Sequence, residues 1–313
     1  MKFVPIRLNL LQPSNSREFD IYIMNDTKPL LLLSGSQPLI DHNALLDNNK
    51  NINVYIPIKQ IDKYNKYIAS NLENILSAND ISKENRLYAV YISIFDKIDN
   101  LVKNNDISLV KDTFQDISNF VLYSMNDSAS VSIFLSFIKS DTSNLSNHMI
   151  NVGIYSSMLT KKLYPEISNK KFEEIARGYF LHDIGMLKID KNIVSKKDKY
   201  TEKEFAEIKK HPIYGVEILE KELKIKSQII KNIVLEHHER IDGSGYPFGK
   251  KNISTFARIC SMCDIFDALT SHREYKKNLP QNTFDALKEN KEYFVKEFGS
   301  EMYASFVKCF SIT

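Results

Sequence analysis

The sequence of 313 residues has few cysteines, no long apolar run and little net charge. Its three cysteines fit a reducing compartment, and Cys260-x-x-Cys263 lacks the second cysteine pair that a zinc site would need. No segment approaches the roughly 18–20 apolar residues of a transmembrane helix, and residues 1–5 have no signal-peptide character. The net charge of +3 is too small to favour binding to nucleic acid or a membrane surface. We therefore expect a cytoplasmic protein.

The apolar residues are arranged with two different periods. Hydrophobic residues make up 43% of the chain and charged residues 26%, which is typical of a globular protein. Short apolar runs at residues 3–8, 20–24, 29–33 and 53–58 are separated by turn-forming residues and predict strands. From Ile61 onward the spacing is helical, and Ile61, Tyr64, Ile68, Leu72 and Ile75 share one stripe. We expect a mainly α protein with a smaller, β-rich α+β domain at the N-terminus.

Histidine is scarce but clustered, because five of the seven histidines lie between positions 148 and 264. The candidate metal ligands are His148, His182, His211, His237 and His238, together with the carboxylates of Asp183 and Asp264. Helical spacing directs most of them inward; His211, for example, follows Phe205 and Ile208 at three-residue steps. One inward histidine is usually a satisfied core residue, but so many buried polar groups need partners or a bound metal. Mixed nitrogen and oxygen ligands favour iron, manganese or cobalt over structural zinc.

An eleven-residue motif makes a family resemblance specific. Residues 237–247 read His-His-Glu-Arg-Ile-Asp-Gly-Ser-Gly-Tyr-Pro, which matches the signature HHExxDGxGYP. Other matching pieces lie around it in the expected order, among them the pair His182-Asp183 and the segment from Ala257 to Thr270. The sequence resembles the HD superfamily of metal-dependent phosphohydrolases, specifically its HD-GYP branch. The resemblance covers roughly the C-terminal 190 residues, a normal size for one domain.

This resemblance implies an all-helical HD-type bundle that hydrolyses cyclic di-GMP to linear pGpG, GMP or both. A hydroxide activated by two divalent ions, iron first and manganese as the alternative, would carry out the attack. The implied metal ligands are His148, His182, Asp183, His211, His237, His238 and Asp264, with Asp183 bridging and with Asp183 and His182 as the catalytic pair. The predicted substrate contacts are Lys188, Arg258, Arg273 and Tyr246, and the predicted loop residues are Glu239, Asp242, Gly243, Gly245, Tyr246 and Pro247.

The expected organisation is a regulatory or interaction domain at residues 1–80, connecting helices at 81–125 and the phosphodiesterase domain at 126–313. A structural extension that helps the chain to dimerise is the alternative for the first domain. The predicted partners are cyclic di-GMP and, through the loop of the motif, a GGDEF-type diguanylate cyclase; a homodimer is also expected. No nucleic-acid polymer and no membrane is expected as a partner.

Two departures from the family pattern affect the prediction. Asn144 occupies the position at which trinuclear members carry a glutamate, so we expect two metals. Met186 stands where many members have a lysine that contacts the substrate phosphate. Because of Met186, the alternative function is a weakly active or inactive module that binds the cyclic dinucleotide or a cyclase partner without turnover. An HD hydrolase for another nucleotide, such as cyclic GMP-AMP, is the remaining alternative.

Overall fold

The computed structural model describes residues 1–11, 17–25, 28–35, 53–124, 128–138, 144–196, 198–270 and 283–310. Its contacts divide the chain into two compact units, Met1–Lys97 and Ile98–Thr313. The division falls within helix α4 (Lys83–Asn104), and the domain boundaries expected from the sequence remain predictions. None of the helices in these described ranges is long and apolar enough to cross a membrane.

The first unit contains a four-stranded antiparallel sheet with the strand order β1-β4-β2-β3. The strands are β1 (Phe3–Ile6), β2 (Ile21–Asn25), β3 (Lys28–Leu33) and β4 (Val54–Pro57), and all four lie at the predicted places. The predicted helical stripe after Ile61 is divided at Asn71 into α2 (Ile61–Ser70) and α3 (Leu72–Ser77). The Asn71 side chain donates a hydrogen bond to the carbonyl of Tyr67, so it closes the first of these helices.

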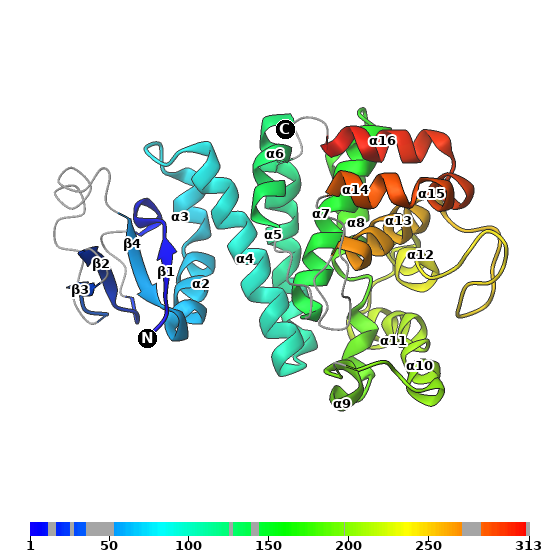
Figure 1. The fold of residues 1–313 in the computed structure, drawn as a ribbon, viewed down its shortest axis with the longest axis horizontal. Helices are drawn as coiled ribbons and strands as arrows, with labels where there is room; N and C mark the ends of the chain where they lie inside the picture. Colours follow the sequence, from blue (N-terminus) through cyan, green and yellow to red (C-terminus); the bar gives the residue numbers. More distant parts are fainter. Residues whose placement is uncertain are drawn as a thin grey trace. The chain divides into compact units, whose positions relative to one another are not determined.

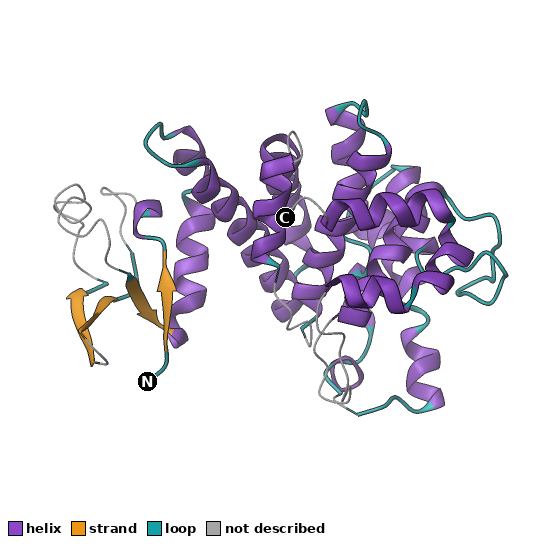
Figure 2. Cartoon of the chain, turned by 45° about the horizontal axis from the view of Figure 1, so that its top comes forward, coloured by secondary structure: helices purple, strands orange, loops and turns teal. Residues whose placement is uncertain are grey.

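In the part that the structure describes, the second unit consists of helices and their connecting loops, without strands (Figures 1 and 2). After α4 come α5 (Val110–Ser124), α6 (Ser128–Phe137), α7 (Leu145–Leu163), α8 (Asn169–Phe180), η4 (Ile184–Lys188), α9 (Lys191–Val194), α10 (Glu202–Ile208), α11 (His211–Glu217), η5 (Ile218–Glu222), α12 (Gln228–Glu236), α13 (Thr255–Thr270), α14 (Thr283–Glu289), α15 (Lys291–Phe298) and α16 (Ser300–Phe310). The predicted fold class, a helical bundle following a small β-rich part, is confirmed.

Helix α7 is the central helix of this unit. Every residue from Ser146 to Thr160 is buried, and the helix packs against α8, α13 and α16 (Figure 1). Helix α12 packs against α8, α11 and α13. The ring of Phe180 on α8 fills the space beside Gly153 of α7, where a β-carbon would lie 2.5 Å from the ring. Helices α7, α8, α12 and α13 therefore surround a shared interior in which any polar side chain must find a partner.

Candidate metal centre

All seven predicted metal ligands meet in this interior. Their potential ligand atoms form two groups, and within each group the atoms lie within 4.8 Å of one another. One group consists of His148, His182 and Asp264; the other consists of Asp183, His211, His237 and His238. Six of the seven residues are buried and His238 is half-buried. The structure thus brings together every residue that the sequence singled out as a ligand.

Helix bodies and helix ends both supply these side chains. His148 comes from α7 and Asp264 from α13, and each projects inward as the helical spacing predicted. His182 and Asp183 lie between the end of α8 and η4, while His237 and His238 follow α12. Because these side chains arrive from separate helices, their mutual distances depend on how the helices pack.

The reason given for the inward position of His211 is wrong, although the residue itself is buried. Phe205 was expected to share a buried stripe with Ile208 and His211, but its side chain is 45% exposed. The stripe fails because α10 ends at Ile208 and a new helix, α11, begins at His211. His211 is therefore held by the first turn of α11.

A close approach between η4 and α11 brings Asp183 to His211. A β-carbon at Gly185 would lie 1.9 Å from the carbonyl oxygen of His211 and 2.5 Å from the amide nitrogen of Gly215. Only glycine lets the two segments touch at this point. As a result, Asp183 Oδ1 lies 3.1 Å from His211 Nε2.

Hydrogen bonds on the outer side of the rings fix the histidine orientations. The Nδ1 atoms of His182, His211 and His237 lie 2.8–2.9 Å from the backbone carbonyl oxygens of Tyr179, Ile208 and Val234. A carbonyl can only accept a hydrogen bond, so Nδ1 carries the proton in each ring and Nε2 presents a lone pair. These lone pairs converge, since His211 Nε2 is 3.3 Å from His237 Nε2. Such an arrangement is repulsive unless a cation lies between the nitrogens.

Asp267 orients His148 in the same way. Its Oδ2 atom lies 2.8 Å from His148 Nδ1, and its Oδ1 accepts a hydrogen bond from Asn151 Nδ2 at 2.9 Å. Sequence reasoning included Asp267 in the family resemblance but gave it no role, because 119 positions separate it from His148. A carboxylate that fixes the outer nitrogen of a metal-ligating histidine is a recurrent feature of metal sites.

The Asp183 carboxylate lies between two pairs of histidines. Its Oδ1 is 3.1 Å from His211 Nε2 and 3.5 Å from His237 Nε2. Its Oδ2 is 3.6 Å from His148 Nε2 and 3.7 Å from His182 Nε2. Although buried, Asp183 Oδ1 accepts no hydrogen bond from the described residues. An orphaned carboxylate oxygen facing nitrogen lone pairs fits the binding of a divalent cation.

Burial and mutual charge set the protonation of the ligands. Burial lowers the pKa of His182 to about 4 and the pKa of His238 well below its ordinary value. Burial alone would raise the pKa of Asp183, but His182 and His211 hold it well below the usual range. Burial also acts to lower the pKa of His148, yet hydrogen bonds to Asp264 and Asp267 raise it well above 6.5. At neutral pH, His182 and His238 are therefore neutral and Asp183 is ionised, which are the forms that bind a metal. His148 must release a proton when a metal binds.

Two buried glutamates hold the loop that follows His238. Glu239, 1% exposed, accepts hydrogen bonds from the amide nitrogens of Phe248 and Lys250 at 2.8 Å each. Glu236 accepts from the Lys250 amine and from the Ser254 amide nitrogen. Glu239 was predicted as a loop residue, and its hydrogen bonds join it to the loop backbone. Glu236 was not predicted. Its contacts are all tertiary, so spacing gave no signal for it.

Inside the loop, Asp242 Oδ1 accepts hydrogen bonds from the amide nitrogen and hydroxyl of Ser244. Gly243 has a φ of 85°, a backbone conformation that favours glycine. A β-carbon at Gly245 would lie 2.4 Å from the amide nitrogen of Arg240, so the chain passes too closely there for any side chain. Pro247 follows Tyr246. The loop therefore has one defined course beside the histidines.

Tyr246 covers one of the predicted ligands. Its ring stacks on the His238 imidazole with centroids 4.5 Å apart and planes inclined by 25°. Burial first, and then the charges of Asp264 and Asp183, raise the pKa of its phenol above the ordinary value. The phenol therefore stays protonated at neutral pH and is a hydrogen-bond donor.

The predicted cationic substrate contacts are placed differently. The Lys188 amine lies 3.1 Å from Glu222 Oε1 and 3.8 Å from Glu217 Oε2, so a phosphate contact would require these ion pairs to break. Arg258 Nη2 donates to the carbonyl of Glu297 at 3.0 Å. Arg273 lies outside the described residues. These substrate contacts stay predictions.

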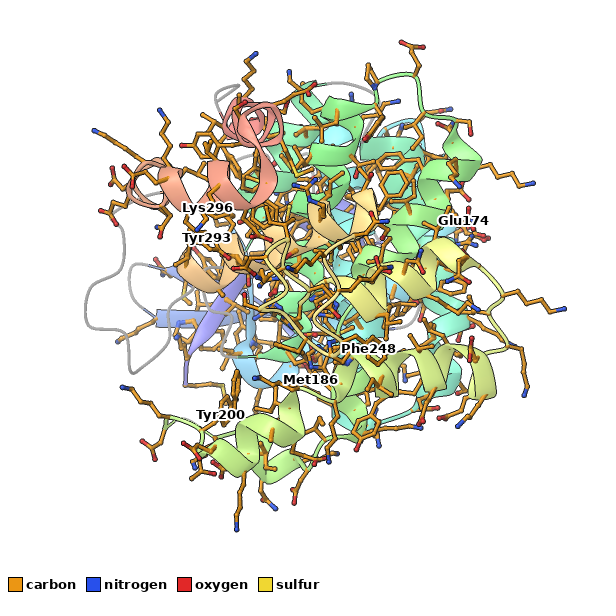
Figure 3. The ribbon with its side chains drawn as sticks, turned by 90° about the vertical axis from the view of Figure 1, so that its right-hand side faces the viewer. Glu174, Met186, Tyr200, Phe248, Tyr293 and Lys296 are labelled. Atoms are coloured by element: carbon orange, nitrogen blue, oxygen red, sulfur yellow. The ribbon has the colours of Figure 1, made fainter. Side chains whose placement is uncertain are left out.

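Met186 is half-buried and lies in η4, three positions after Asp183. Figure 3 shows Met186 and Phe248 near the middle of the face turned to the viewer, with Tyr200, Tyr293 and Lys296 farther out. The Phe248 side chain is 67% exposed at the tip of the loop. Met186 thus presents an uncharged thioether at this position.

The Asn144 side chain has a structural function at the start of α7. Its Oδ1 accepts a hydrogen bond from the amide nitrogen of Ser146 at 2.9 Å, so the residue caps the helix. An amide engaged in capping is a poor substitute for the glutamate of trinuclear relatives. This observation agrees with the expectation of two metals, which remains a prediction.

Comparison with known proteins establishes the family. A family model described as HD domain matches residues 135–295. The chain belongs to the HD domain family. Its likeness to the HD-GYP branch, recognised in the motif at residues 237–247, is confirmed, and membership of the HD domain family implies binding of divalent metal.

Relatives of this HD domain protein include two curated phosphodiesterases. The chain is 32% identical over 209 residues to a cyclic di-GMP phosphodiesterase, PA4108 of Pseudomonas aeruginosa, covering 66% of this chain and 48% of that protein. It is 37% identical over 131 residues to a 3′3′-cGAMP-specific phosphodiesterase of Vibrio cholerae, covering 41% of this chain and 25% of that protein. The matched part thus spans at most about half the length of these relatives.

A solved structure shares the fold of the HD domain protein along nearly its whole length. Bd1817, an HD-GYP-type protein from Bdellovibrio bacteriovorus, superposes with a TM-score of 0.64 and 21% identity. The match covers 97% of this chain and 98% of Bd1817. At this identity the likeness concerns the fold alone.

Proposed function

We propose that this protein is a metal-dependent phosphodiesterase that hydrolyses cyclic di-GMP to linear pGpG, GMP or both. The observation that carries the proposal is the placement of Asp183, whose two carboxylate oxygens face two separate pairs of histidines. The name of the Pseudomonas relative supports cyclic di-GMP as the substrate.

We infer that two divalent cations bind, iron first and manganese as the alternative. His148, His182 and Asp264 would hold one cation, and His211, His237 and His238 the other. Asp183 would contribute one oxygen to each. Imidazole and carboxylate ligands without thiolate suit these metals.

The chemistry divides between the cations and the chain. When bound, divalent cations acidify water to supply a nucleophile near neutral pH and neutralise the charge of the phosphate. The carbonyls of Tyr179, Ile208 and Val234 and the carboxylate of Asp267 keep the imidazoles in a fixed orientation. The side chains thus need little rearrangement as charge develops on the phosphate.

Tyr246 has two roles in this proposal. Its ring covers His238 and excludes water from that side of the site. Its phenol, protonated at neutral pH, can donate a hydrogen bond to a phosphate oxygen or to a guanine carbonyl. Lys188, Arg258 and Arg273 remain predicted substrate contacts.

Two other functions are distinguishable from this one. Hydrolysis of 3′3′-cGAMP is favoured by the Vibrio relative, which is named for that substrate. Binding without turnover is favoured by Met186, which removes a cation from the substrate site. The docking of a GGDEF-type cyclase, a homodimer and a regulatory first domain remain predictions.

The decisive experiment measures metal content and turnover on one anaerobically purified sample. We expect about two Fe or Mn per chain and a linear product from cyclic di-GMP, with slower turnover of 3′3′-cGAMP. Asp183→Asn should abolish turnover and lower the metal content, because the amide cannot bridge two cations.

Asp190→Asn is the matched control, since Asp190 is an exposed helix cap seven positions away and asparagine caps equally well. It should behave as the wild type. A protein that holds two metals and binds cyclic di-GMP tightly but forms no product would be a binding module and not a phosphodiesterase. A protein that retains no metal, or an Asp183→Asn variant with full activity, would refute the proposal.

A further inference from the structure

Among the described residues, four cations on the elements that carry the candidate metal centre are engaged in ion pairs or structural hydrogen bonds. Lys250 pairs with Glu236, Lys188 with Glu222, and Arg258 donates to the carbonyl of Glu297. Arg240 Nη1 donates to the carbonyl of Glu239 and to the hydroxyl of Ser261. None of these side chains is available to an anionic substrate without breaking a contact of the fold.

Lys209 is placed differently, between the end of α10 and the start of α11. Its amine lies 4.7 Å from the ring centroid of Phe205 and 5.5 Å from that of Tyr246. In the described ranges Lys209 forms no ion pair, whereas the adjacent Lys210 pairs with Glu207. An exposed ammonium held only by aromatic faces is weakly bound and can move to a stronger partner.

The position of Lys209 relates it directly to the candidate metal centre. The Tyr246 ring that it approaches is the one stacked on the His238 imidazole at 4.5 Å. The amine and a predicted ligand therefore lie beside the same aromatic ring. The flexible stem of lysine lets its charge follow a bound anion within this range.

The proposed substrate offers the protein a second anionic group. A cyclic dinucleotide carries two phosphodiester groups, and only one can occupy the metal centre at a time. The other remains charged and must be held or left in water. Met186 offers no charge at the position where many relatives have lysine.

We propose that Lys209 binds the phosphodiester group that is not being cleaved. This inference rests on the proposed function and specifies how the same site recognises its substrate. Because the contact is remote from the reacting phosphorus, Lys209 contributes to affinity and leaves the chemical step unchanged.

Three variants of the full-length, metal-loaded protein test this inference. Lys209→Met removes the charge, Lys209→Arg keeps it, and Lys210→Met is the control on the neighbouring, paired lysine. The readouts are binding of a hydrolysis-resistant phosphorothioate analogue of cyclic di-GMP, kcat and KM for cyclic di-GMP, and hydrolysis of bis(p-nitrophenyl) phosphate. The last substrate has a single phosphodiester group and cannot use a second anion site.

We expect Lys209→Met to weaken binding of the analogue and to raise KM by about tenfold, with kcat nearly unchanged. Hydrolysis of bis(p-nitrophenyl) phosphate should stay at the wild-type rate. Lys209→Arg should restore most of the affinity, and Lys210→Met should equal the wild type.

Unchanged binding in Lys209→Met would overturn the assignment of Lys209 and leave the proposed function standing. An equal loss on both substrates would also overturn it, because it would indicate general damage to the metal centre. A wild-type protein that neither binds the analogue nor hydrolyses cyclic di-GMP would overturn the proposed function and this inference together.

Discussion

Asp267 contacts the outer nitrogen of His148, on the opposite side of the ring from the predicted metal. Its carboxylate holds the proton on Nδ1 and so leaves Nε2, which is 3.2 Å from Asp264 Oδ1, as the ligand atom. An asparagine at position 267 could turn its amide nitrogen toward Nδ1, which would move the ring proton to Nε2. The protonated Nε2 could not bind a cation.

We therefore predict that Asp267→Asn weakens metal binding about 10- to 100-fold while the fold is retained. Calorimetric titration of chelated protein with Mn²⁺ measures this change in metal affinity. The Asp190→Asn control should keep the wild-type affinity. Wild-type affinity in Asp267→Asn would show that the His148 orientation does not depend on Asp267.

At the scale of elements, the loop after α12 depends on Glu239. This carboxylate receives the amide hydrogens of Phe248 and Lys250, both of which would otherwise need other acceptors. A glutamine offers one acceptor oxygen in place of two, so one amide loses its partner. An unsatisfied amide of this kind costs about 1–3 kcal/mol.

We predict that Glu239→Gln speeds hydrogen exchange of the Phe248 or Lys250 amide by about 10- to 100-fold, while α7 stays protected. Hydrogen–deuterium exchange followed by mass spectrometry checks this. Glu292→Gln, at an exposed site in the first turn of α15, should leave the loop unchanged. Equal exchange in both variants would mean that Glu239 does not hold the loop.

Helical periodicity correctly predicted the inward position of a candidate ligand where the whole pattern belongs to one helix. His148 on α7 and Asp264 on α13 face the interior as their spacing indicated. The same reasoning failed for Phe205, because spacing cannot locate the break between α10 and α11. Asp267 and Lys209 had no assigned role, since the contact of Asp267 with His148 and that of Lys209 with Tyr246 join residues from different elements. Contacts between elements depend on how the elements pack, and the local spacing of residues does not encode that packing.

For the whole molecule, the helical class and the small β-rich part near the N-terminus followed from the change of hydrophobic period near Ile61. The division inside α4 could not be predicted, because a continuous amphipathic helix shows no boundary in its sequence. The seven-ligand set came from the family resemblance together with the clustering of histidines. The structure adds the distances that make Asp183 common to both groups.

The whole chain should also respond to pH once metal has been removed. The pKa of His182 is lowered to about 4 in the folded state, against 6.5 for an ordinary histidine, and that of His238 is also lowered. Between these values the unfolded state binds more protons, so stability falls as pH falls from 6.5 to 4. The pKa of His148 is raised, so below pH 6.5 this residue is protonated in both states and adds no slope.

We predict that chelated protein loses up to about 1.4 kcal/mol of unfolding free energy per pH unit within this window through His182, and that the lowered pKa of His238 adds to the loss in the same direction. Urea denaturation of chelated protein at pH 4.5, 5.5 and 6.5 measures the slope. Stability that is constant or that increases toward pH 4.5 would contradict the neutral state of His182.

The ligand cluster draws on three helices, α7, α11 and α13, and on the segments that directly follow α8 and α12, and its residues extend from His148 to Asp264. Cations bound there would connect distant stretches of polypeptide in the manner of cross-links, and would stabilise only the folded chain. Chains made during metal shortage would open more often and be degraded sooner. The supply of divalent metal in the cell would therefore control how much of this protein persists, in addition to how fast each copy works.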